Sequence, residues 1–291
     1  MKIIKNFKKQ FDYKPTIRNR DKLKKSKDFF VAGMGGSHLS ADIIRDIFPE
    51  LNIQVHSDYG LPRKINKESL LILSSFSGNT EEVLDTCYCA LKAKIPLIIV
   101  SSGGQLIEIA KNNALPYIEL PDSSIPPRMA LGYSIKALLK IVNKKIDFEI
   151  KDNENLGKEI AKKVKGTIPL IYSSNKNKSI GYIWKINFNE NSKNPAFSNV
   201  FPELNHNEVE GINEKDFSFI LIEDELDHPR VKLRMEIFKK RYKTITLKDN
   251  PINLIILSLW TSYYLALENK VDPISVNKIE ELKKELSQWQ S

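Results

Sequence analysis

Two turns rich in glycine and hydroxyl side chains carry the clearest chemical signal in this sequence. Turn A (residues 33–37) is Gly-Met-Gly-Gly-Ser, and turn B (residues 74–82) contains Ser75, Ser77 and Thr80. Each turn follows an apolar run typical of a buried strand and precedes a pattern typical of a helix. A helix N-terminus presents unpaired N–H groups and positive partial charge, and serine and threonine add hydroxyl donors. Together the turns favour an anion site, although each alone could be an ordinary connecting turn.

Neither turn matches a nucleotide-binding motif. Turn B lacks the Lys-Ser/Thr pair that closes a P-loop, and turn A does not complete a G-x-G-x-x-G pattern. Both motifs depend on glycines at fixed spacing, and the P-loop depends on a lysine as well, whereas this chain lacks those spacings. A small phosphorylated ligand is therefore favoured over a nucleotide.

A candidate general base stands near the end of a helix predicted over residues 178–190. Glu190 shares a helical face with a mainly apolar set of residues, namely Ile180, Ile183, Trp184 and Asn187. A carboxylate in apolar surroundings has its pKa raised towards neutrality, which suits a base. The same spacing fits equally well an amide-rich helix end that only turns the chain.

Other polar residues are candidates on weaker grounds. Arg128 lies in the first turn of a predicted helix, where a cation opposes the helix dipole, so an anionic ligand or a salt bridge across the domain boundary is expected to hold it. His206 can transfer a proton near neutral pH, although a lone histidine in a polar segment is more often a surface residue. The pair Asp227-His228 precedes Pro229, and Asp227 as N-cap favours a helix start over a catalytic pair.

The cysteine and histidine pattern supports neither a disulfide nor a metal site. The two cysteines, Cys87 and Cys89, fall on different faces of a predicted helix. The four histidines are scattered, with no two at the usual spacing of metal ligands. We therefore expect no bound metal and a reducing, cytoplasmic environment.

Composition excludes several classes of partner. Of the 291 residues, 41% are hydrophobic and 28% are charged, as in ordinary globular proteins. The net charge of +9 comes from dispersed lysines without interleaved aromatic residues, so nucleic-acid binding is not expected. No apolar stretch reaches membrane-spanning length, and residues 1–10 lack the apolar core of a signal peptide, so no membrane association is expected.

Alternating apolar runs and helical patterns predict two α/β domains, residues 1–150 and 151–291. Strands are expected near 28–33, 52–56, 70–75, 95–101 and 115–120, and again near 168–173, 197–200, 217–222 and 242–246. Helices are expected near 37–47, 79–93, 104–112 and 127–144, and again near 178–190, 229–239, 251–268 and 276–287. Residues 144–166, rich in lysine and acidic residues, are expected to join the domains. Ligands should bind at the carboxyl ends of the strands, where both turns lie.

A series of motifs in order resembles the bifunctional phosphoglucose/phosphomannose isomerases, which consist of two sugar isomerase (SIS) domains. The motifs are turn A, turn B and the segments 127–133, 189–193 and 203–208, and the run 272–283 is also similar to theirs. The resemblance implies an α/β fold of two SIS-type doubly wound domains, each a parallel sheet flanked by helices. It places the two turns in the first domain and Glu190 and His206 in the second.

The same resemblance implies aldose–ketose isomerisation of phosphorylated hexoses without a metal or organic cofactor. The residues that would surround the sugar phosphate are Gly35, Gly36, Ser37, Ser75, Ser77 and Thr80, with Glu82 beside them. Glu190 would move a proton between C2 and C1 through an enediolate, and Arg128 would stabilise the negative charge of that intermediate. His206 would help to open the sugar ring, and Lys283 matches a lysine near the chain end. The family also implies a homodimer in which His206 acts in the partner subunit's active site.

Two positions depart from the family pattern. Many members carry a threonine in the segment entering the last helix, associated with acceptance of the mannose epimer, whereas Ile274 or Ser275 occupies that place here. His38 stands where a small residue is expected. Two rival functions remain, a sugar-phosphate sensor and an isomerase of another phosphosugar. The sensor would need an output domain, and the residues before 28 are too few for one.

Overall fold

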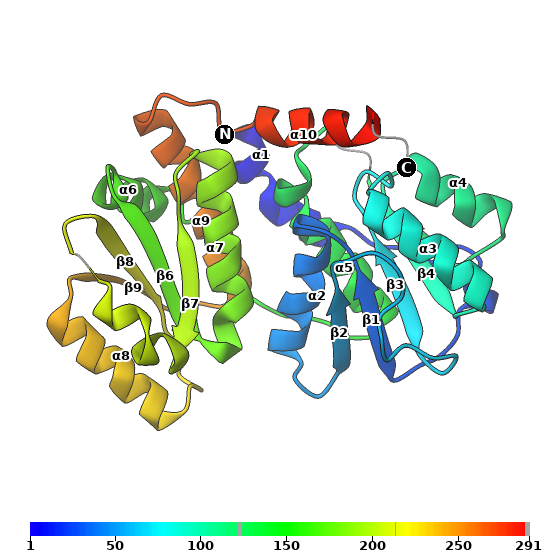
Figure 1. The fold of residues 1–291 in the computed structure, drawn as a ribbon, viewed down its shortest axis with the longest axis horizontal. Coiled ribbons are helices and arrows are strands. Elements are labelled where there is room, and N and C mark those ends of the chain that lie inside the picture. Colours follow the sequence, from blue (N-terminus) through cyan, green and yellow to red (C-terminus); the bar gives the residue numbers. More distant parts are fainter. Residues whose placement is uncertain (122–123, 213, 289–291) are drawn as a thin grey trace. The chain divides into compact units, whose positions relative to one another are not determined.

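The computed structural model describes residues 1–121, 124–212 and 214–288. The chain forms two compact units, Met1–Glu149 (unit 1) and Ile150–Ser291 (unit 2). Each unit contains its own parallel β-sheet with helices packed against it (Figure 1). The predicted α/β class, with two parallel sheets flanked by helices, is confirmed.

Unit 1 is built on a five-stranded parallel sheet of order β2-β1-β3-β4-β5. Its strands are β1 (Asp28–Ala32), β2 (Asn52–His56), β3 (Leu70–Ser74), β4 (Leu97–Ser101) and β5 (Tyr117–Glu119). Every residue of β3 and β4 is buried, as expected for central strands covered on both faces. All five strands were predicted within a few residues of their observed bounds.

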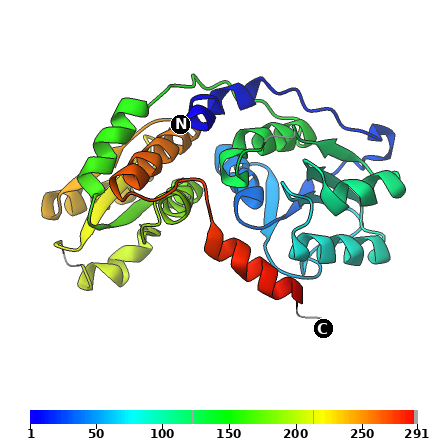
Figure 2. The ribbon, with the colours of Figure 1, turned by 90° about the horizontal axis from the view of Figure 1, so that it is seen from above.

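The helices of unit 1 cover both faces of this sheet (Figure 2). They are α2 (Gly36–Ile47), α3 (Glu81–Ala93), α4 (Gly104–Asn112) and α5 (Leu131–Ile141). Helices α3 and α4 share an apolar core with one face of the sheet, whereas α2 packs against α5. From β1 the chain moves to β2 at one edge of the sheet, and from β3 it moves through β4 towards β5 at the other edge. Right-handed crossovers in these two opposite directions place α2 and α3 on opposite faces.

The N-terminal segment is part of unit 1. It contains the short helices α1 (Lys2–Lys5), η1 (Phe7–Asp12) and η2 (Arg20–Lys22). Gln10, which is buried, donates from Nε2 to the carbonyl oxygen of Met129 at 2.7 Å and accepts from the N–H of Gly132 at 2.9 Å. Arg18 pairs with Tyr117 at the outer edge of β5. The sequence pattern did not predict this attachment.

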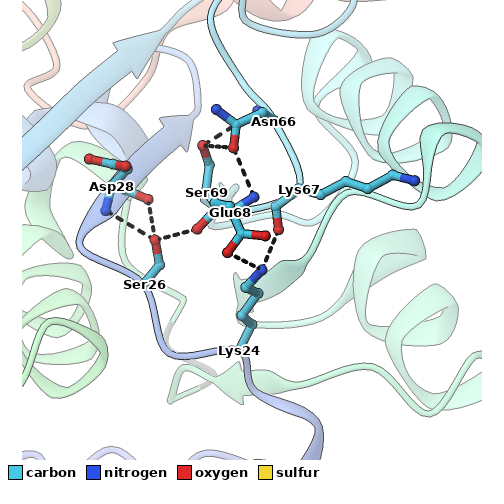
Figure 3. Close-up of polar contacts among 7 residues, drawn as sticks. All are labelled: Lys24, Ser26, Asp28, Asn66, Lys67, Glu68 and Ser69. Atoms are coloured by element: carbon cyan, nitrogen blue, oxygen red, sulfur yellow. Dashed lines mark hydrogen bonds and ion pairs between the residues drawn. The ribbon is translucent and has the colours of Figure 1, made fainter.

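A polar network ties the chain entering β1 to the chain entering β3 (Figure 3). The Oγ atom of Ser26 donates to the carbonyl oxygen of Glu68 at 2.8 Å and accepts from the N–H of Asp28 at 3.0 Å. Lys24 forms an ion pair with the Glu68 carboxylate at 3.0 Å. This network lies at the amino ends of the strands, opposite to the edge that carries turns A and B.

Unit 2 repeats the strand order of unit 1 with one strand fewer. Its strands are β6 (Ile168–Ser174), β7 (Phe197–Phe201), β8 (Phe217–Ile222) and β9 (Thr244–Leu247), in the parallel order β7-β6-β8-β9. Its helices are α6 (Glu154–Val164), α7 (Lys178–Asn191), α8 (Pro229–Arg241), α9 (Pro251–Glu268) and α10 (Asn277–Gln288). Helix α9 packs against α6 and α7, whereas α8 covers an aromatic cluster on the sheet.

In unit 2 one helix was not predicted and one N-cap was assigned to the wrong residue. The segment 144–166, where the domain boundary was expected, also contains α6, whose buried residues Ile160 and Val164 face α9. Its many lysines are compatible with a helix because only one face is buried. The N-cap of α8 is His228, not Asp227. The ring nitrogen Nδ1 of His228 accepts from the N–H of Arg230 at 3.1 Å, whereas the Asp227 carboxylate accepts from the N–H of Asp224.

Candidate active site

Turn A connects β1 to α2 and requires glycine for two different reasons. Gly35 has a φ of +49°, a backbone conformation that favours glycine. Gly33 lies so close to the neighbouring strand that a Cβ atom there would be 2.9 Å from the carbonyl oxygen of Ser74. Gly36 is the first residue of α2, so the N-terminus of this helix opens at the carboxyl edge of the sheet.

Turns A and B lie next to each other because β1 and β3 are neighbouring strands. The Oγ atom of Ser74 donates to the carbonyl oxygen of Ser37 at 2.8 Å, and Ser37 Oγ accepts from the N–H of Phe76 at 3.2 Å. Within turn B the hydroxyls of Ser75 and Thr80 are hydrogen bonded at 2.8 Å. Ser75 is buried and Ser77 is exposed, so the hydroxyls span the depth of the turn.

A third turn, which the sequence analysis missed, supports turn B. Turn C (residues 101–104) connects β4 to α4 and has the same strand–Ser/Gly–helix pattern, a signal that was present in the sequence. The N–H of Ser102 donates to the carbonyl oxygen of Phe76 at 3.0 Å. Gly78, with a φ of +72°, fits so tightly that an added Cβ would lie 1.9 Å from the Gly103 carbonyl oxygen. Turn C therefore holds the backbone of turn B in one conformation.

Arg128 lies beside turn A. It is 8% exposed and belongs to a short 3₁₀ helix, η3 (Pro127–Met129), that precedes α5. The expectation that Arg128 occupies the first turn of the following α-helix was wrong, because α5 begins only at Leu131. A Cβ added to Gly36 would be 3.4 Å from the Cα of Arg128, so a glycine at this position lets the two backbones approach. Unit 1 thus contains both turns and, next to turn A, the buried Arg128.

The remaining residues predicted near the phosphate lie at the N-terminal ends of helices. Glu82 is in the first turn of α3 and is half-buried. His38 is in the first turn of α2, where its Nδ1 contacts the Asp42 carboxylate at 2.8 Å. Asp42 also accepts from Arg45 at 2.6 Å. The departure at His38 is therefore accommodated by hydrogen bonds along α2.

In unit 2, Glu190 lines a cavity of about 540 Å³. The cavity is also lined by Asn189, Lys193, Asn194, Pro195, Ser275, Val276, Asn277, Lys278 and Ile279. Glu190 is half-buried, whereas the residues expected to share its face, including Ile183, Trp184 and Asn187, are buried. The helical spacing therefore placed Glu190 at the margin of the apolar face, where a carboxylate can reach a ligand.

Two buried amides anchor the helix that carries Glu190. Asn187 donates from Nδ2 to Ser258 Oγ at 2.7 Å, and Asn191 donates to Ser262 Oγ at 2.9 Å. Both serines are on α9, and both asparagines are buried. Because α7 is fixed on either side of residue 190, the position of the Glu190 backbone is well determined.

Lys193 joins the end of α7 to the segment that precedes α10. Its Nζ atom donates to the carbonyl oxygens of Glu190 at 2.7 Å, Asp272 at 2.7 Å and Ser275 at 2.6 Å. This arrangement brings Ser275 to the cavity of Glu190. Lys193 belongs to the same sequence motif as Glu190, but its contacts could not be predicted, since carbonyl acceptors carry no side-chain signal.

Two predicted site residues lie elsewhere in unit 2. His206 is exposed and ends the short helix η5 (Glu203–His206), which follows β7. Lys283 is exposed on α10 and contacts the Glu280 carboxylate at 2.9 Å. Glu190 precedes β7 and His206 follows it, so within one subunit these two residues stand at opposite edges of the sheet. Neither His206 nor Lys283 lines the cavity of Glu190.

The described ranges show neither a metal cluster nor a membrane helix. No group of three or more His, Cys, Asp or Glu side chains in those ranges could hold a metal ion. No helix within them is long and apolar enough to cross a membrane. Cys87 and Cys89 are free thiols.

Comparison with known proteins decides the family. Residues 153–286 match the sequence profile of the bacterial phospho-glucose isomerase C-terminal SIS domain. The bifunctional phosphoglucose/phosphomannose isomerase of Aquifex aeolicus is 33% identical, over 98% of this chain and 97% of that protein. The chain belongs to this family. A further bifunctional phosphoglucose/phosphomannose isomerase, from Caldicellulosiruptor bescii, is 32% identical and aligns over 89% of each chain.

The fold of the phosphoglucose/phosphomannose isomerase family is shared more widely. The C-terminal domain of glucosamine-fructose-6-phosphate aminotransferase from Francisella tularensis matches with a TM-score of 0.69 at 13% identity. The match covers 94% of this chain and 97% of that domain. At this identity the likeness shows a common architecture and no more. Membership of the isomerase family, predicted from the motifs, is confirmed by the sequence relatives.

Proposed function

We propose that this chain is a cytoplasmic isomerase that interconverts glucose 6-phosphate, and also mannose 6-phosphate, with fructose 6-phosphate. The observation that carries the proposal is the 33% identity to a bifunctional phosphoglucose/phosphomannose isomerase along 98% of this chain. Arg128 beside turns A and B, and Glu190 in a cavity of its own, supply the chemical groups that this reaction needs.

The proposed mechanism assigns one role to each group. The N-termini of α2 and α3 and the hydroxyls of Ser37, Ser75 and Thr80 bind the phosphate. The carboxylate of Glu190 accepts the proton from C2 of the open-chain aldose and returns it to C1, through an enediolate. Arg128 stabilises the negative charge that develops on the enediolate oxygens. No step calls for a metal or an organic cofactor.

We further propose that the active protein is a homodimer in which His206 opens the sugar ring in the partner subunit's site. Glu190 and His206 of one subunit are separated by β7, whose five residues span roughly 17 Å at about 3.3 Å per residue. This separation supports a histidine supplied by a second subunit. A two-fold dimer supplies each site with the missing histidine.

Acceptance of the mannose epimer is proposed to depend on Ser275. Ser275, and not Ile274, lines the cavity that contains Glu190. A hydroxyl there can hydrogen bond to a sugar hydroxyl, as the family's threonine is expected to do. Ser275→Ala is therefore expected to reduce turnover of mannose 6-phosphate more than turnover of glucose 6-phosphate.

The direct test is an assay of the purified full chain with each of the three hexose phosphates, with and without a chelator. We expect conversion of glucose and mannose 6-phosphates to fructose 6-phosphate that the chelator leaves unchanged. Binding without conversion would favour a sugar-phosphate sensor. Conversion of a different phosphosugar alone would favour the rival isomerase function.

A further inference from the structure

Both residues that flank His206 are hydrogen bonded, Asn205 to helix α8 and Asn207 within the segment 203–208, although His206 itself is exposed. Asn205 accepts from Arg234 of α8 at 3.1 Å. Asn207 accepts from the N–H of Glu208 at 2.6 Å and donates from Nδ2 to Glu203 at 3.2 Å. These bonds fix the backbone on both sides of the imidazole.

The strongest tie belongs to Glu208, at the start of the 3₁₀ helix η6 (Glu208–Glu210). One carboxylate oxygen accepts from the hydroxyl of Tyr172 at 2.9 Å, and the other accepts from Nδ2 of Asn199. A carboxylate is suited to this position because both its oxygens accept and neither donates. The amide of Asn199 is itself oriented, since its Oδ1 accepts from the N–H of Val200 at 2.8 Å.

Tyr172 provides a rigid attachment point for Glu208. The tyrosine is on β6 and is 1% exposed. Its ring packs against Phe201 and Phe238 with near-perpendicular rings at 6.2 Å and 5.6 Å. A ring enclosed in this way has little freedom to move, so the position of its hydroxyl is set by the core of the unit.

We infer that Glu208, held by Tyr172 and Asn199, is a positioning residue that presents His206 to the partner subunit's substrate. The inference rests on the role of His206 under the proposed function. A histidine that must act on another subunit's ligand needs a fixed backbone, because a displacement of about 1 Å can cost roughly a hundredfold in rate. The network supplies this rigidity while leaving the imidazole free to reach outwards.

The test combines kinetics with hydrogen exchange on the full chain. Tyr172→Phe and Glu208→Gln each remove part of the network, and Tyr242→Phe is the matched control. Tyr242 packs against Phe238 in the same aromatic cluster, so its variant also removes one phenolic hydroxyl, but not one bonded to Glu208. Each variant is also placed in a His206→Ala background.

For Tyr172→Phe and Glu208→Gln we expect kcat to fall about tenfold with KM nearly unchanged, and amide exchange in residues 203–210 to quicken about tenfold. In the His206→Ala background the same substitutions should lower kcat by less than about twofold, because the histidine they position is gone. Tyr242→Phe should change neither measurement. Glu208 is exposed, so Glu208→Gln keeps the test valid if Tyr172→Phe is poorly folded.

Three outcomes would overturn the inference. Unchanged exchange in residues 203–210 would show that the network does not hold this segment. Losses of equal size with and without His206 would show a structural role unrelated to the histidine. Equal losses in Tyr242→Phe would point to general damage to the aromatic cluster. A His206→Ala enzyme with wild-type kcat would instead refute the proposed role of His206 itself, independently of its neighbours.

Discussion

Glu190 and His206 lie at opposite ends of one β-strand. Glu190 is on the last turn of α7, and Asn194 shortly after it donates to the carbonyl oxygen of Thr167, just before β6 begins. His206 follows Phe201, which pairs with Ser174 at the far end of β6. The parallel sheet produces this separation. All its strands run in one direction, so Glu190 lies at their amino ends and His206 lies at their carboxyl ends.

This separation predicts a specific result in subunit complementation. Glu190→Gln and His206→Ala chains, each retaining only a small residual activity by itself, should regain about a quarter of wild-type activity by site counting when they are dissociated and reassociated in equal amounts. Half of the dimers are then mixed, and each mixed dimer has one site with both lesions and one intact site. Assays of the reassociated mixture check this. Persistently inactive mixtures in which heterodimers are demonstrated would exclude action of His206 across the interface.

Removing the carboxylate of Glu190 should abolish turnover and leave binding intact. For Glu190→Gln we expect kcat to fall on the order of a thousandfold or more, because the only proposed base is gone. The dissociation constant for fructose 6-phosphate should change little, since Gln preserves size and polarity. Glu236→Gln on the exposed face of α8 is the matched control and should retain full activity. Turnover of Glu190→Gln within tenfold of wild type would remove Glu190 from the base role.

The phosphate is expected to bind mainly at turn B. Each neutral donor to a charged group contributes roughly 1.5–3 kcal/mol, so replacing Ser75 and Thr80 together by Ala should raise KM about a hundredfold or more. The control is Ser69→Ala, which removes a buried hydroxyl at the other end of β3 (Figure 3). Steady-state kinetics with fructose 6-phosphate decide the matter. An unchanged KM in the double variant would place the phosphate elsewhere.

Turn B should not tolerate a side chain at Gly78. Gly78 has a φ of +72°, which a residue with a Cβ disfavours, and an added Cβ would meet the carbonyl oxygen of Gly103, so Gly78→Ala should lower the free energy of unfolding by about 3 kcal/mol or more. Gly166 has a similar φ of +77° with open space around its Cβ position. Gly166→Ala should therefore cost only about 1 kcal/mol. Denaturant unfolding of both variants measures the difference, and equal costs would disprove the contact between turns B and C.

The two thiols should differ in reactivity. Burial raises the pKa of the Cys87 thiol to about 11, so near pH 8 it remains protonated as well as inaccessible. Cys89 is partly exposed on the same helix. A maleimide at pH 8 should label Cys89 rapidly and Cys87 only after unfolding. Labelling of a Cys89→Ser variant with and without denaturant provides the check, and fast labelling of the folded variant would contradict it.

Much of the architecture could be predicted because its signals are local. Apolar runs covered on both faces revealed β3 and β4, and helical periodicity revealed α7 and α9. Turns A and B could be recognised as strand-to-helix connections because glycine and serine are concentrated between an apolar run and a helical pattern. Residue type and spacing alone were sufficient for these features.

Other features depend on groups that meet only in the folded chain. Helix α6 was missed because packing against α9 stabilises it more than its lysine-rich composition suggests. The contact of Gly78 with Gly103 and the carbonyl acceptors of Lys193 involve backbone atoms, which every residue possesses. The order of strands in the sheet separates Glu190 from His206. The distance between Glu190 and His206 cannot be predicted from their spacing in the sequence, because residues close in the chain can lie a full strand length apart.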